Sequence, residues 1–105
     1  MLTIEVIALV DEASFKVSAA EYGAALRSLQ MARRLVARMD ARHALGFAEG
    51  EMVISLLCGA ETALHDAAQS ARAVPMGRKT RVGLTDALVR IKTMMENLER
   101  RGVIG

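Results

Sequence analysis

The residues best suited to chemistry in this sequence are a cysteine, a glutamate and a histidine at helical spacing. Cys58, Glu61 and His65 would share one side of a helix, and thiolate, carboxylate and imidazole groups all bind transition metals. A metal centre needs further ligands, and no second group of such residues occurs; the only other histidine is His43. We therefore expect no metal, cofactor or catalytic residue. The three residues are interpreted as a polar outer face with a Glu61–His65 contact.

Basic residues gather in two places. One is a proline–glycine segment that has no acidic residue between Asp66 and Asp86, and the other is an arginine stripe on a predicted helix, which also includes Arg27. Guanidinium and ammonium groups near a helix start bind phosphate. The candidate nucleic-acid or anion contacts are Arg72, Arg78, Lys79, Arg81, Arg34 and Arg38. A solvated basic surface explains them equally, and we favour it because no aromatic residue is interleaved for base stacking.

Arg38 and His43 are separated by four residues. This pair resembles the arginine–histidine pair of HEPN-type ribonucleases, which are small helical dimers with composite sites. The resemblance implies a histidine that assists a ribose hydroxyl and an arginine that holds phosphate. His43 also falls near a predicted helix end, where a cation suits the helix dipole. A ribonuclease is therefore a third hypothesis.

Residues 94–104 resemble the recognition-helix end of winged-helix regulators, in which a helix closes on a Leu-Glu-Arg-Arg-Gly-hydrophobic step. We expect no wing after Ile104, and no separate helix with a tight turn precedes Thr85 at the required distance. A glycine C-cap at Gly102, with the following apolar residues folded onto Leu98, explains the same sequence, and we prefer it.

Three long segments must position these residues, and all three are amphipathic. Apolar residues repeat at alternating three- and four-residue steps, which places them on one side of a helix that needs another helix to cover it. The predicted seams are Tyr22, Ala25, Leu29, Ala32, Val36 and Met39; then Val53, Leu56, Ala60, Ala63, Ala67 and Ala71; then Leu84, Leu88, Ile91, Met95 and Leu98.

Capping and breaking signals set the predicted helix boundaries. Ser18 and Glu21 have the spacing of a capping box. Pro75 ends the middle segment, Thr85 is a candidate N-cap and Gly102 a candidate C′ residue. The predicted helices cover 18–43, 50–73 and 85–101, with a basic Pro/Gly loop over 74–84.

Residues 1–17 alternate in a way that predicts a strand or short hairpin. A two-stranded hairpin is marginal alone, and Ile7 and Leu9 would be exposed on its second face. We expect the same strand of a second copy to cover this edge; a partner protein's sheet is the alternative.

Composition indicates a single domain, since the chain has 105 residues of which 52% are hydrophobic. A net charge of +2 permits nucleic-acid contact without arguing for it. One cysteine fits a reducing compartment. The first ten residues carry Glu5 and no basic leader, so we expect neither a signal peptide nor a membrane span, and a cytoplasmic location.

The sequence therefore predicts a mainly α fold, in which a short N-terminal β-strand or hairpin precedes a three-helix antiparallel bundle that dimerisation completes. The expected function is non-enzymatic: a self-associating structural or adaptor protein that acts through protein–protein interaction and has no membrane partner. The predicted oligomer interface contains Ile7, Leu9, Tyr22, Leu29 and Val36. The alternative is a small nucleic-acid-binding regulator that uses the basic 72–81 loop and the arginine stripe.

Overall fold

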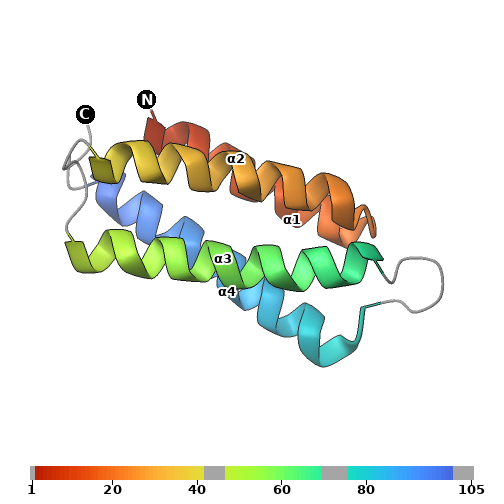
Figure 1. The fold of residues 1–105 in the computed structure, drawn as a ribbon. Coiled ribbons are helices and arrows are strands. Elements are labelled where there is room, and N and C mark those ends of the chain that lie inside the picture. The colour runs from red at the N-terminus through yellow and green to blue at the C-terminus, as the bar shows by residue number, and fades with distance from the viewer. Residues whose placement is uncertain (1, 42–46, 70–75, 101–105) are drawn as a thin grey trace.

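The computed structural model describes residues 2–41, 47–69 and 76–100, and its elements are four α-helices (Figure 1). They are α1 (Leu2–Ser18), α2 (Tyr22–Ala41), α3 (Phe47–Gln69) and α4 (Arg78–Arg100). Consecutive helices run antiparallel. Helices α1 and α3 each pack on α2 and α4, and across the described residues neither diagonal pair packs together. The result is an up-down-up-down bundle of 44 × 21 × 20 Å.

The predicted N-terminal strand is wrong, because residues 2–18 form helix α1. The bundle consequently has four helices instead of three, and these residues offer no strand edge to a second copy or to a partner's sheet. The buried residues of α1 follow helical three- and four-residue steps and are Thr3, Val6, Val10, Ala13 and Val17. Nearly every residue up to Val10 is apolar. The same residues therefore fit the two-residue period of a strand and the three- and four-residue steps of a helix.

A Schellman motif ends α1 and turns the chain into α2. The Glu21 amide donates to the Lys16 carbonyl oxygen at 2.8 Å, and the Ala20 amide donates to the Val17 carbonyl oxygen at 3.0 Å. Ala20 has a φ of 60°, which is the left-handed position that glycine normally fills. The motif fixes a tight antiparallel turn between α1 and α2.

The capping box predicted at Ser18 is wrong, since Ser18 is the last residue of α1 and its hydroxyl donates to the Ser14 carbonyl oxygen at 3.2 Å. Helix α2 begins at Tyr22 instead, and the Glu21 carbonyl oxygen accepts from the Ala25 amide at 2.9 Å. The spacing of a capping box therefore also occurs where the hydroxyl residue ends one helix and the carboxylate residue precedes the next.

Helix α4 begins two turns earlier than predicted, at Arg78 instead of Thr85. The Gly77 carbonyl oxygen accepts from the Arg81 amide at 2.9 Å, so the helix starts there. Residues 78–83 are all exposed, so no buried apolar residue marks these turns in the sequence. The second half of the predicted basic loop is helical. Helix α3 covers 47–69 instead of 50–73, and residues 42–43, 70–75 and 101 of the predicted elements lie outside the described part of the chain.

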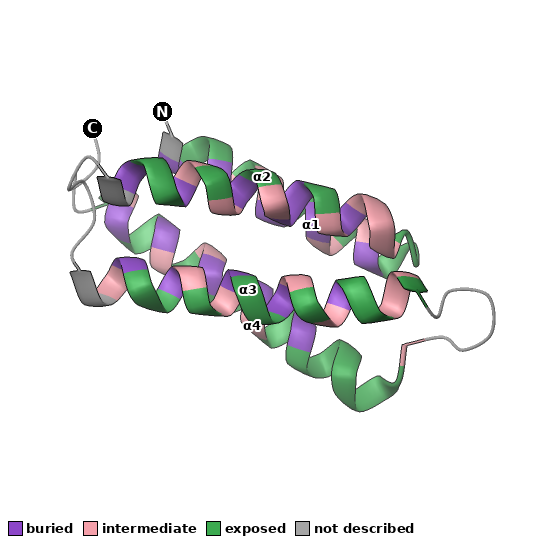
Figure 2. Cartoon of the chain, viewed as in Figure 1, coloured by how far each residue is buried: buried purple, intermediate pink, exposed green. Residues whose placement is uncertain are grey.

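Two of the three predicted seams are confirmed. Burial runs along the inner sides of the helices in Figure 2, and it includes Ala25, Leu29, Ala32, Val36 and Met39 of α2 and Leu84, Leu88, Ile91, Met95 and Leu98 of α4. Tyr22 is half-buried against this core.

The predicted seam of α3 is confirmed at Val53 and Ala60 and wrong at its other described positions. Its buried residues are Val53, Leu57, Ala60 and Leu64, whereas Leu56, Ala63 and Ala67 are half-buried and Ala71 lies outside the described residues. Helix α3 is apolar on two sides, so two sets of three- and four-residue steps compete. The two sets share Val53 and Ala60. The set that also contains Leu57 and Leu64 has larger side chains than the set with Leu56 and Ala63, and it is the one that fills the core.

A dimer was predicted because the N-terminal strand and the apolar seams of the helices needed a cover. The four-helix bundle covers the seams within one chain. Leu29 and Val36, two residues of the predicted oligomer interface, are fully buried in the bundle's own core. Ile7, Leu9 and Tyr22 are half-buried against that core. Self-association stays a prediction that needs another surface.

Candidate functional site

The side of α1 that points away from the bundle carries apolar side chains on both sides of an acidic turn at Asp11 and Glu12. Ile4 is 54% exposed and Phe15 is 73% exposed, and Ala8 between them is also exposed. These residues lie opposite the buried set of α1. A helix on a protein surface normally turns polar residues outward, and one that is apolar on both sides usually has a cover. The outer side of α1 therefore has the character of a contact surface.

A groove of about 460 Å³ lies beside this surface, between α1 and α2. Its lining is Glu5, Ala8, Leu9, Met31, Arg34, Leu35 and Arg38. Leu9 and Leu35 are half-buried and pack against the core, whereas Met31 is 53% exposed. We call the groove together with the outer side of α1 the α1/α2 face. It combines an apolar centre with charged edges.

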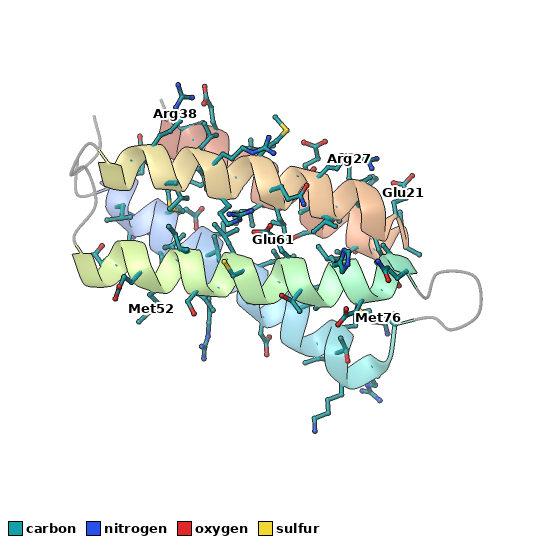
Figure 3. The ribbon with its side chains drawn as sticks, in the orientation of Figure 1. Glu21, Arg27, Arg38, Met52, Glu61 and Met76 are labelled. Carbon is teal, nitrogen blue, oxygen red and sulfur yellow. The ribbon has the colours of Figure 1, made fainter. Side chains whose placement is uncertain are left out.

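The two edges of the α1/α2 face carry opposite charges. Helix α2 contributes an arginine stripe in which Met31 is embedded, and Figure 3 shows Arg27 and Arg38 projecting from α2 on the side away from α3. Helix α1 contributes Glu5 and Glu12, both exposed. The face is therefore acidic along α1 and basic along α2.

The structure brings together residues that were predicted to have separate roles. Arg34 and Arg38 were predicted to contact an anion and Leu9 to join an oligomer interface, and all three line this groove. Sequence reasoning missed Ile4, Phe15 and Met31. A helical reading of the first segment would have placed Ile4 and Phe15 opposite its buried set.

Arg33 is set apart from the arginine stripe by an ion pair inside the bundle. Its Nε lies 2.7 Å from Oε2 of Glu61, and the Glu61 side chain is only 13% exposed. In Figure 3 Glu61 lies between α2 and α3. The hydrogen bond from Arg33 to this carboxylate, followed by the attraction of its charge, raises the pKa of Arg33. This pair ties α2 to α3.

Cys58, Glu61 and His65 do not form a common site. The predicted Glu61–His65 contact is wrong, because Glu61 pairs with Arg33 while Nε2 of His65 lies 3.1 Å from Nε2 of Gln69. Cys58 and His65 are both exposed. Across the described residues, no three histidine, cysteine, aspartate or glutamate side chains gather as metal ligands would.

Three cations occupy the first two turns of α4, and its first turn contains no acidic residue. Arg78, Lys79 and Arg81 are all exposed, and they add positive charge at the positive end of the helix dipole. Arg72 lies outside the described residues. Arg81 lines a small hollow with Ser18, Val82, Thr85 and Asp86, where the end of α1 meets α4.

Arg38 lies at the opposite end of the bundle from the cations that begin α4, whereas Arg27 of the arginine stripe lies near their end (Figure 3). Figure 3 places Arg38 near one end and Met76, just before α4, near the other. The cations at the start of α4 and the groove arginines therefore do not form one continuous surface.

Both resemblances depend partly on residues that the structure does not describe. Arg38 is exposed in the groove, but His43 lies outside the described residues, as do Gly102 and Ile104. Leu98 is buried in the core of the bundle.

None of the helices in the described ranges combines the length and the apolar character that crossing a membrane requires. The chain matches no protein-family model, no curated protein and no solved structure. Its function must therefore be argued from its own residues.

Proposed function

We propose that this chain is a non-enzymatic, self-associating protein that acts as a structural or adaptor component, and that it docks through the α1/α2 face. The observation that carries the proposal is the exposure of Met31 in the groove and of Ile4 and Phe15 on the outer side of α1. Covering such side chains is favourable by about 25 cal/mol for each Å² of apolar surface removed from water. A second polypeptide on this face would supply that cover.

The polar groups that suit catalysis support binding over chemistry. Glu61 is held by Arg33, and His65 lies beside Gln69 on the outside of α3. A nucleophile with an adjacent base is the usual arrangement for covalent catalysis. Glu61 and His65 instead contact Arg33 and Gln69, which are not nucleophiles.

Exchanging Met31 for glutamate should weaken self-association at least about tenfold, because a charge would enter the apolar centre of the face and lose its hydration on docking. Met52→Glu on α3 is the matched control: Met31 is 53% and Met52 56% exposed, and Met52 lies on the opposite side of the bundle (Figure 3). Sedimentation velocity across micromolar concentrations measures both variants beside the wild type. A wild type that stays monomeric, or equal weakening by both variants, would contradict the proposal.

A nucleic-acid-binding regulator is the second candidate function. The observation in its favour is the cluster Arg78, Lys79 and Arg81, which crowds three cations onto a helix end that already attracts anions. Bound phosphate would relieve that crowding. The groove arginines lie at the other end of the bundle, so this candidate depends on the start of α4.

Replacing Arg78, Lys79 and Arg81 together by alanine should weaken binding to duplex or single-stranded nucleic acid. The slope of log K against log salt concentration should fall by up to about three units, because each lost phosphate contact removes roughly one released counterion. Fluorescence anisotropy at several salt concentrations measures this slope. The matched control replaces Arg27, Arg34 and Arg38. A wild type without salt-dependent binding removes the candidate.

A further inference from the structure

We infer that two copies of the chain pair about a two-fold axis parallel to the helices, so that α1 of each copy lies over α2 of the other. This inference rests on the proposed self-association and adds the orientation of the partner. It follows from which helix of the α1/α2 face carries each charge, and from the position of each residue along the bundle axis, which we call its height.

The charges on the face are sorted by helix. Helix α1 carries Glu5 and Glu12 on this side, and Glu12 is partly offset by Lys16 of the same helix. Helix α2 carries the arginine stripe of Arg27, Arg34 and Arg38. None of these three arginines has an ion pair within the described residues. They are therefore available to an acidic group on another molecule.

A symmetric pair formed by this face has two simple arrangements, since a two-fold interface uses the same surface on both copies. An axis that crosses the helices places α1 on α1 and α2 on α2. Arginine stripe then meets arginine stripe, which disfavours association. An axis along the helices places α1 on α2, so each acidic edge meets a basic edge. Charge complementarity selects the second arrangement.

The heights of the residues then identify the contacts. Rotation about an axis along the helices leaves the height of every residue along the bundle unchanged. Lys16 Nζ lies 3.3 Å from Ser28 Oγ, which sets the register of α2 against α1. Because the two helices are antiparallel and rise equally per residue, Glu5, eleven residues before Lys16, lies near the level of Arg38, ten residues after Ser28, and both line the groove. Glu5 of each copy therefore comes over Arg38 of the partner subunit.

The same rotation brings the apolar residues of the two copies together. Ala8 and Leu9 of one copy come over the partner's Leu35, and Ile4 and Met31 approach from the two sides. Helix α1 has 17 residues, and a helix of that length is about 26 Å long. Two helices about 10 Å apart present a face of roughly 500 Å² per copy, or about 1,000 Å² in total. That area is at the lower end for specific complexes.

Charge reversal tests the arrangement on the full-length chain. Glu5→Arg and Arg38→Glu should each weaken self-association at least about tenfold, because both symmetric pairs become like-charged. An equimolar mixture of the two variants should associate at least about tenfold more tightly than either alone, since the mixed pair opposes unlike charges at both positions. Within each variant chain the two groups remain like-charged, so the regained association reports contacts between copies.

The double variant Glu5→Arg/Arg38→Glu should also regain association. Glu5 lies in the first turn of α1 and Arg38 in the last turn of α2, where their charges suit the helix dipoles. The double variant reverses both, so a gain in helix stability cannot explain its recovery. Glu51→Arg on α3 and Arg90→Glu on α4, both exposed, are control variants that should leave association unchanged. Far-UV circular dichroism verifies that every variant is folded.

Sedimentation equilibrium separates the failure of this inference from the failure of the proposed function. A wild-type chain that remains monomeric overturns both. A wild type that dimerises, with single reversals that have no effect or a mixture that gains nothing, overturns the orientation and leaves the proposed function in place.

Discussion

Replacing Ala8 with proline is expected to lower the free energy of unfolding by about 3 kcal/mol or more. Ala8 lies in the middle of α1 and is exposed, so the substitution removes no core packing. Proline would delete the amide that bonds the Ile4 carbonyl and would clash with that carbonyl. Urea unfolding followed by circular dichroism, at a concentration where the wild type is monomeric, measures the effect.

The matched control at the same site is Ala8→Gly, which should cost only about 1 kcal/mol because glycine keeps the amide and loses only helix propensity. A proline variant that costs no more than the glycine variant would contradict a helix at residues 2–18. The loss is large for a bundle of this size, since single domains are usually stable by about 5–15 kcal/mol.

Truncating Leu57 to alanine should lower the free energy of unfolding by about 3 kcal/mol. The Leu57 side chain of α3 is fully buried in the core, and a large-to-small change there leaves a cavity. Leu56→Ala, one position earlier and half-buried, should cost about 1 kcal/mol or less. The pair has the same chemistry and the same helix, so the difference isolates burial. Thermal and urea unfolding of both variants measure it. Equal losses would contradict the register of α3.

The sequence predicted helices best where polar and apolar residues separate cleanly. In α2 and α4 the apolar residues form one narrow seam among many charges, so only one helical register buries them. Leu29 and Ile91 were accordingly placed in the core correctly. In α3 both Leu56 and Leu57 are apolar, and only the packed neighbours decide which of them turns inward.

The N-terminal segment could not be assigned from its pattern because it is apolar on nearly all sides. Val6 and Val10 point to the core in a strand and in a helix alike. Ile4, in contrast, joins the buried side of a strand but faces outward from a helix, and it is exposed in the structure. Because the segment was interpreted as a strand, neither helix α1 nor its exposed apolar residues were predicted.

The candidate site was only partly predictable for the same reason. Arg34, Arg38 and Leu9 were identified from residue type, but a groove between two helices cannot be inferred while one of them is taken for a strand. Met31 was hidden within the arginine stripe, where a single apolar residue carries no periodic signal. Packing of α1 on α2 supplied what the sequence pattern lacked.

The ring of helix contacts has a consequence for how the chain folds. Among the described helices, three interfaces join helices that follow each other directly, and only the α1–α4 interface joins distant parts of the chain. Such low contact order lowers the entropy lost in closing loops and favours rapid folding. We expect helical hairpins to form first and the α1–α4 contact to close the ring last, so that α1 would reach its final position only when the bundle is complete.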